Sequence, residues 1–402
     1  MTVNYLAFAI PAFFIFVFIE YKVAQQRKKK RVFSYESSIA NFSVGIAERL
    51  LNLFIAGSFY QAYQWVYDHY AIFKISNSWY VWLLLLLATD FVWYWYHRLG
   101  HEINFLWAAH IVHHQSEEFN FTAAARITTI QAIFRNIFWC VLPLVGFHPN
   151  MIITILLVHG AYSFFTHTQL IGKLGWLENV LITPSLHGVH HASDEKYLDK
   201  NYGDVFVFWD KLFGTFQQEE EPPRYGLTHP IKSSSFLWQH FHYYLEIAEA
   251  YKRAAGTKAK WNALFGSPAL MDQNIRPILE QRYFRNKEQK KSVLKFRNYL
   301  NVQLIVVVAT LTGTTMFYEY LQEIDKWAIL VFSLLTLINI GALLEQRIWI
   351  YYLEAFRLIF LVAFFFYSFE IFEWVIFPII LLILLERTCS LKTRYNRYML
   401  SH

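Results

Sequence analysis

Cysteine is almost absent from this 402-residue sequence, which contains only Cys140 and Cys389. The two lie far apart in apparently different surroundings, so a disulfide framework is excluded as the organising device of the fold. Charged residues are also few, at 16% of the chain, against about 25% in an ordinary soluble domain. The sequence therefore lacks both the cross-links of a small secreted domain and the charged surface of a soluble one.

Apolar and aromatic residues dominate instead. The chain is 55% hydrophobic and 19% aromatic, with 38 Phe, 26 Tyr and 14 Trp, which is typical of a polytopic membrane protein. The formal net charge of +6 is modest and gathers in a few runs. Beside membrane spans, such runs indicate topology and contact with lipid headgroups. We therefore expect no nucleic-acid partner, and nothing in the sequence indicates the oligomeric state.

Apolar segments of the length that crosses a bilayer, about 20 residues, recur along the chain. They predict an all-α transmembrane bundle with nine spans, at about 4–20, 40–66, 78–97, 128–147, 150–168, 300–319, 326–344, 347–367 and 370–386. The first segment has no basic n-region and no cleavage site, so we interpret it as a membrane helix rather than a signal peptide. Basic residues in RKKKR (27–31) and in the C-terminal tail place both ends in the cytoplasm. The membrane is either a bacterial inner membrane or the endoplasmic reticulum.

The spans suggest four regions. We predict N-terminal membrane helices at 1–77, a catalytic region at 78–235, a cytoplasmic surface segment at 236–298, and C-terminal helices with a basic tail at 299–402. The surface segment includes the basic run at 285–297. The second span contains Glu48 and Arg49, which either pair inside the bundle or mark an interfacial helix before a shorter span.

Three histidine clusters stand out: HRLGH (97–101), HIVHH (110–114) and HGVHH (187–191). On a helix, their spacings put the rings of each cluster on one face, about 6 Å apart at Cβ, so each cluster is predicted to act as a metal clamp. Imidazole binds iron, zinc, copper and nickel. Eight buried imidazoles without a partner would be costly, which favours metal binding over a hydrogen-bonded core. The predicted ligands are His97, His101, His110, His113, His114, His187, His190 and His191.

Eight imidazoles are too many for one ion, because a catalytic zinc takes about three protein ligands. We therefore predict a dinuclear centre on the cytoplasmic side, with the element left open. His167, in FFTHT, lies at the depth of His97 and is predicted as a ninth ligand, the alternative being a polar helix end. His159 lies deeper and on another side of the same helix, so it is not included.

Three further residues are candidates to support the ligands. Asp90 lies two turns before His97 in an apolar segment, where an acid needs a reason. It either holds a ligand histidine through the second ring nitrogen or pairs with Arg98 or another basic group. Glu102 follows the first cluster, and Asn201 follows the third, where it either holds a histidine or caps a turn. No catalytic group beyond the metal ligands, and no substrate-binding residue, is identified.

The strings DFVWYWYHRLGHEINFLWAAHIVHHQSEEFNF and LHGVHHASDEKYLDKNYGDVFVFWDKLFGTF resemble the fatty acid hydroxylase and sterol desaturase superfamily of membrane di-iron enzymes. The resemblance is strong over about 90–230. It implies that the eight clustered histidines bind two iron ions and that His167 belongs with them. It also implies O2 as oxidant, a lipid substrate and an external two-electron donor. Related fatty acid 2-hydroxylases have a further histidine where this chain has Ser163, which suggests nine ligands rather than ten.

Within this superfamily, the sequence is similar to the branch that oxidises alkylglycerols. That similarity implies hydroxylation beside the ether oxygen, giving fatty aldehyde and glycerol, with tetrahydrobiopterin as the donor; a redox partner protein is the alternative. No residue pattern independently indicates a pterin site. One rival hypothesis is a sterol or fatty-acyl desaturase or hydroxylase with the same metals. Another is a metal-handling membrane protein, although a transporter would place its ligands near the membrane midplane.

Overall fold

The computed structural model describes residues 3–231, 233–284, 297–347, 349–371 and 376–399. Within these ranges the chain is helical and has no β-strand, only two isolated bridges, Leu181 with Phe206 and Ala192 with Tyr225. The all-α prediction is therefore confirmed, and both cysteines are free. Most of the predicted basic run at 285–297, and part of the last predicted span, lie outside the described residues.

The chain forms two compact units. One comprises Phe14–Lys232 and His240–Arg285, and it contains all three histidine clusters; the other comprises Met1–Phe13, Ser233–Gln239 and Asn286–His402. The four regions expected from the sequence stay a prediction.

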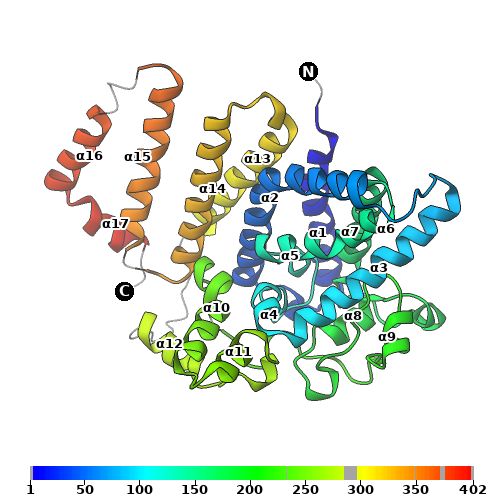
Figure 1. Cartoon of the computed structure of the whole chain (residues 1–402). Helices are drawn as coiled ribbons and strands as arrows, with labels where there is room; N and C mark the ends of the chain where they lie inside the picture. The colour runs from blue at the N-terminus through cyan, green and yellow to red at the C-terminus, as the bar shows by residue number, and fades with distance from the viewer. Residues whose placement is uncertain (1–2, 232, 285–296, 348, 372–375, 400–402) are drawn as a thin grey trace. The chain divides into compact units, whose positions relative to one another are not determined.

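The helices of the first part of the chain are coloured from blue to green in Figure 1. In chain order they are α1 (Ala9–Gln26), α2 (Tyr35–Tyr70), α3 (Trp79–Glu102), α4 (Asn104–His110), α5 (Thr129–Trp139), α6 (Val141–Val145), α7 (Pro149–Thr166), α8 (Pro184–His190) and α9 (Phe208–Phe213). Helix α3 packs against α4, α5 and α7. The ends of α3, α4, α7 and α8 all carry histidines, so this packing brings clusters distant in sequence together.

The later helices follow in order: α10 (Phe236–Arg253), α11 (Thr257–Phe265), α12 (Ile275–Tyr283), α13 (Arg297–Phe317), α14 (Glu323–Leu344), α15 (Ile350–Ser368), α16 (Ile376–Cys389) and α17 (Leu391–Met399). A polar network is buried between α13, α14 and α15. In it, Glu354 accepts from Tyr299 (2.6 Å), Asn339 (2.7 Å) and Arg357 (2.6 Å). Burying an ion pair among apolar helices is costly, and hydrogen bonds to the carboxylate such as these offset that cost.

Six helices among the described residues are long and apolar enough to cross a membrane: Tyr5–Gln26, Tyr35–Tyr70, Pro149–Thr166, Arg297–Tyr320, Glu323–Leu344 and Ile350–Ser368. The protein is thus a membrane protein, and the count of nine spans stays a prediction. The predicted span at 128–147 is divided into α5 and α6. Pro143 explains the division, because its missing N–H leaves the carbonyl of Trp139 without its helical donor.

The predicted second span is one continuous 36-residue helix, α2. The Glu48 carboxylate is buried, and it lies 2.8 Å from Nε of Arg49. The Arg49 side chain is 53% exposed, so only the carboxylate of this pair is buried. On the same helix, Gly45 packs against Ala125, where an added Cβ would lie 2.6 Å from the Ala125 carbonyl oxygen. Glycine at this position lets α2 approach the segment that follows the second histidine cluster.

Candidate metal centre

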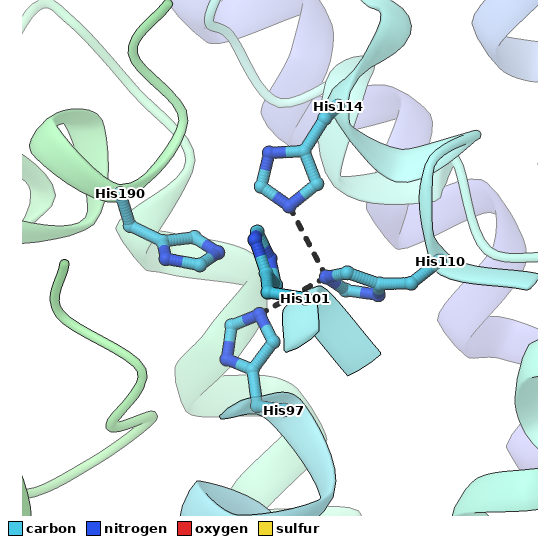
Figure 2. Close-up of side chains that lie close together, drawn as sticks. All are labelled: His97, His101, His110, His114 and His190. Atoms are coloured by element: carbon cyan, nitrogen blue, oxygen red, sulfur yellow. Dashed lines mark hydrogen bonds between the residues drawn. The ribbon is translucent and has the colours of Figure 1, made fainter. Parts of the chain in front are cut away.

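The five-histidine group joins rings from three parts of the chain. It consists of His97, His101, His110, His114 and His190, whose facing nitrogens all lie within 4.8 Å of one another. Nε2 of His110 lies 3.0 Å from Nε2 of His97 and 3.1 Å from Nε2 of His114. Figure 2 shows the rings arriving from different directions around a common centre.

The four-histidine group consists of His113, His167, His187 and His191, again within 4.8 Å of one another. Nε2 of His167 lies 3.2 Å from Nε2 of His113 and 3.1 Å from Nε2 of His187, and His191 follows at 3.2 Å from His187. The structure thus brings all nine predicted ligands into two adjacent groups. His167 takes part, as expected from its depth at the end of α7.

The first cluster stays together in one group, but the second and third are each divided between the two groups, so the prediction that each cluster acts as one clamp is wrong for these two. Helix α4 ends at His110, and His113 lies in a following 3₁₀ turn, where it joins the four-histidine group. In the third cluster His190 joins the five-histidine group, whereas His187 and His191 join the other. Neighbouring residues on a helix point about 100° apart, so adjacent histidines reach different centres.

Backbone carbonyls fix the orientation of several rings. Nδ1 of His97 donates to the carbonyl of Tyr202 (2.8 Å), and Nδ1 of His190 donates to the carbonyl of Lys200 (2.8 Å). In the other group, Nδ1 of His167 donates to the carbonyl of Ser163 (2.8 Å). Because a carbonyl can only accept, the proton of each neutral ring lies on Nδ1 and the lone pair lies on Nε2. That is the nitrogen that faces the centre.

Burial keeps the imidazoles neutral. It lowers the pKa of His110, His187 and His190 well below the ordinary histidine value, and neighbouring imidazoles lower it further. For His167, burial lowers the pKa to about 4. At neutral pH these rings therefore carry a free lone pair, which is the form that binds metal.

The residues present fit two metal ions. Nε2 of His101 and Nε2 of His190 are buried and make no hydrogen bond, an arrangement that costs about 1–3 kcal/mol for each atom without a partner. A cation at the centre of the five-histidine group would satisfy these two atoms, and the convergent Nε2 atoms of the four-histidine group offer a second cation site. All-imidazole donor sets suit iron, zinc, copper and nickel.

Aromatic rings close the sides of the site. The Trp107 ring lies 4.8 Å from that of His101, and the Phe119 ring lies 5.1 Å from that of His191. Tyr202 is buried and lies 5.3 Å from His101, between ring centroids. Such a wall excludes water from the histidines on these sides.

Known proteins share this part of the chain. The fatty acid hydroxylase family model matches residues 82–215. Alkylglycerol monooxygenase of Homo sapiens is 32% identical over 353 residues, covering 86% of this chain and 78% of that protein. Its counterpart in Danio rerio is 30% identical over 317 residues, covering 77% and 70%. The chain belongs to the fatty acid hydroxylase family, in the branch that includes these proteins.

Its membership of the fatty acid hydroxylase family and its similarity to alkylglycerol monooxygenases identify this protein as a membrane lipid monooxygenase. A more distant relative, cholesterol 25-hydroxylase of Homo sapiens, is 28% identical over 153 residues, covering 35% of this chain and 53% of that protein. No solved structure matches the chain.

None of the supporting residues expected of this hydroxylase contacts a candidate ligand directly, and Asp90 pairs with a basic residue other than Arg98. Asp90 contacts neither His97 nor Arg98; its carboxylate accepts from His159 Nε2 at 3.1 Å. Glu102 is exposed and pairs with Arg98 at 2.8 Å, because consecutive helical residues point in different directions. The two charges therefore satisfy each other at the surface, away from the rings.

Asn201 is buried and supports a ligand histidine only indirectly. Its amide donates to the carbonyls of Leu186 (2.9 Å) and Gln217 (2.8 Å), and its side-chain oxygen accepts from the Gln217 N–H (2.9 Å). It ties the segment after the third cluster to α8, one residue before His187.

Gln131 was not predicted, although it contacts a candidate ligand directly. It lies in the first turn of α5, with its amide nitrogen 2.9 Å from Nδ1 of His110 and its amide oxygen buried without a partner. The two ends of an amide are assigned from their hydrogen bonds. With a metal ion on Nε2 of His110, Nδ1 carries the proton, and Gln131 must turn its oxygen toward it. A lone glutamine in an apolar segment gives no sequence signal for this role.

Replacing Gln131 with leucine should weaken metal binding by the five-histidine group about 10- to 100-fold, the usual effect of losing an outer hydrogen bond to a ligand histidine. Replacement with glutamate is the matched control, because it keeps an acceptor for Nδ1–H. Titration of the metal-free protein with Co2+ measures both constants. Unchanged affinity in the leucine variant would contradict the role.

Proposed function

We propose that the protein is a di-iron monooxygenase that hydroxylates alkylglycerols at the carbon beside the ether oxygen, with its site on the cytoplasmic side of the membrane. The observation that carries the proposal is the pairing of two convergent imidazole groups in a chain similar to alkylglycerol monooxygenases over most of its length. The basic ends of the chain support the cytoplasmic placement.

Each group would hold one iron ion. The first ion would be held by His97, His101, His110, His114 and His190, and the second by His113, His167, His187 and His191. Bound iron supplies the activation of O2 that inserts one oxygen atom into an unactivated C–H bond. Both groups consist of neutral imidazoles and contain no carboxylate. The ligands would therefore not neutralise the positive charge of the ions.

The chain's own residues orient the imidazole rings and exclude water from the site. The carbonyls of Lys200, Tyr202 and Ser163 hold three rings in the tautomer that presents Nε2 to the ion. Trp107 and Phe119 cover the histidines on two sides. Exclusion of water would protect a strongly oxidising centre from side reactions.

The reaction balances with an external reductant. One atom of O2 enters the C–H bond beside the ether oxygen, and the other leaves as water after it takes up two electrons and two protons. The resulting hemiacetal breaks its bond to the ether oxygen and gives a fatty aldehyde and glycerol. We propose tetrahydrobiopterin as the two-electron donor, with a redox partner protein as the alternative.

The experiment supplies iron-loaded, purified protein with a 1-O-alkylglycerol, cholesterol and a fatty acid in separate reactions under 18O2. We expect fatty aldehyde from the ether alone, with one 18O atom retained when the aldehyde is trapped by immediate reduction. Omitting tetrahydrobiopterin should stop the reaction, and restoring it with a reduced ferredoxin would favour a protein donor. Oxidised cholesterol without aldehyde would favour the sterol alternative, which the chain's similarity to cholesterol 25-hydroxylase keeps open.

The metal-handling alternative makes a different prediction for the same sample. A sensor or transporter would bind metal and consume no O2 when reductant and lipid are supplied. Its ligands would also be spread through a translocation path, whereas the nine histidines here are gathered in two adjacent groups.

A further inference from the structure

A short loop after α8, residues 199–206, connects two rings of the five-histidine group. The carbonyls of Lys200 and Tyr202 accept from Nδ1 of His190 and His97. Between them, Asn201 has a φ of 54°, in the left-handed region that few side chains adopt. This conformation turns the carbonyls on either side of Asn201 toward the histidines. Two of the five rings are therefore oriented by one loop. The loop can hold them in place only if side chains from other elements fix its own position.

Two buried carboxylates hold this loop through its backbone N–H groups. Asp210 accepts from the N–H of Tyr202 (2.7 Å) and of Gly203 (2.8 Å). Asp90, on α3, accepts from the N–H of Val205 (2.9 Å) and of Phe206 (3.0 Å). The loop is thus tied both to α9 and to the helix that carries His97.

A third residue, His159 on α7, joins Asp90 to the loop itself. Its Nε2 lies 3.1 Å from Asp90 Oδ1, and its Nδ1 lies 2.7 Å from Asp204 Oδ2. All three side chains are buried. A neutral imidazole can donate only one N–H, whereas a protonated ring can form an ion pair with both carboxylates. The protonated ring also offsets one of the two buried negative charges.

We propose that Asp90, His159 and Asp204 are positioning residues that fix the 199–206 loop and, through it, the rings of His97 and His190. The inference rests on the proposed function, in which the five-histidine group holds iron. It explains why an acid lies inside the apolar part of α3 without contacting a candidate ligand. It also assigns a role to His159, a histidine that takes part in neither group.

The same three residues are close enough to hold a metal ion of their own, but both oxygens of Asp90 are already committed. Asp90 Oδ1 accepts from His159 and from the Val205 N–H, and Oδ2 accepts from the Phe206 N–H and from Trp209 Nε1 (3.0 Å). A metal ion would have to displace several of these bonds. The arrangement therefore favours an anchor over a third metal site.

The test compares metal binding by Asp90→Asn and His159→Gln with that of the unmodified chain, using Co2+ added to metal-free protein in detergent. Asparagine has the shape of aspartate but places an NH2 group opposite one of the two backbone N–H donors. We expect the affinity of one cobalt site to fall about 10- to 100-fold and the other to remain. The cobalt absorption bands that remain should match those of His97→Ala, in which the five-histidine group lacks a ligand.

Hydrogen exchange over residues 200–206 gives a second readout and should become faster in both variants. Leu142→Ala, a buried change in α6, is the control for loss of stability alone, and it should leave both cobalt sites intact. Retention of both sites in Asp90→Asn and His159→Gln would overturn the proposal, as would loss of both sites together. If the unmodified chain bound cobalt at two sites but its iron-loaded form did not oxidise the ether, only the proposed function would be overturned. A chain that binds no metal would overturn both proposals.

Discussion

Replacing His113 with alanine should remove the ion of the four-histidine group, leave that of the five-histidine group in place, and abolish lipid oxidation. The sequence places His113 beside His110 and His114, but its Nε2 lies 3.2 Å from that of His167. Only three imidazoles would then remain around the second centre. A metal ion contributes several kcal/mol to such a reaction, so we expect turnover to fall about 1,000-fold or more.

His114→Ala is the matched variant, because it removes a neighbouring ring from the other group. Iron per chain should fall from two to about one in each variant, and Mössbauer spectra of the two residual sites should differ. If the two variants lost the same spectral component, the division of the second cluster between the groups would be wrong. The measurement thus tests the arrangement of the rings independently of any substrate.

Replacing Arg126 with leucine should lower the free energy of unfolding by about 3–5 kcal/mol, since it leaves several buried acceptors without a donor. Nε of Arg126 donates to the carbonyl of Val112 (2.7 Å), and Nη1 donates to Asn41 on α2 (2.8 Å); Nη2 donates to the side chain of Gln115. The guanidinium is buried and holds the turn between His110 and His114 against α2.

Arg98→Leu is the control for this change. Arg98 pairs with exposed Glu102 on the surface, and such a pair contributes about 0–1 kcal/mol. Denaturant unfolding in detergent, followed by tryptophan fluorescence, measures both variants. A loss below about 1 kcal/mol in Arg126→Leu would mean that the turn is held by other contacts. Because the turn carries His113, we also expect the variant to bind iron less tightly.

The sequence was sufficient for the helical class and the membrane character, and local spacing singled out the eight clustered histidines that the structure brings together with His167. Apolar runs identify spans wherever they lie, and repeated histidine spacings stand out in an apolar chain. The assignment of each ring to a centre was not predictable in the same way. It depends on where α4 ends, and an extension of that helix by one turn would change the direction of His113.

The partners of the rings were harder still to predict. Backbone carbonyls such as those of Lys200 and Tyr202 have no residue type that marks them, and their direction depends on the left-handed conformation of Asn201. Asp90 was noticed because an acid is rare in an apolar helix, yet its partner His159 lies on another helix. Spacing within one helix cannot indicate such a contact.

The division of the clusters also affects how the protein is made. Each group contains residues from early and late parts of the chain, and the groups are completed by two consecutive residues, His190 and His191. A nascent chain that ends before them has no full set of imidazoles for either ion. Under the proposed function, each iron ion would therefore find its complete set of imidazoles only after synthesis has passed this point.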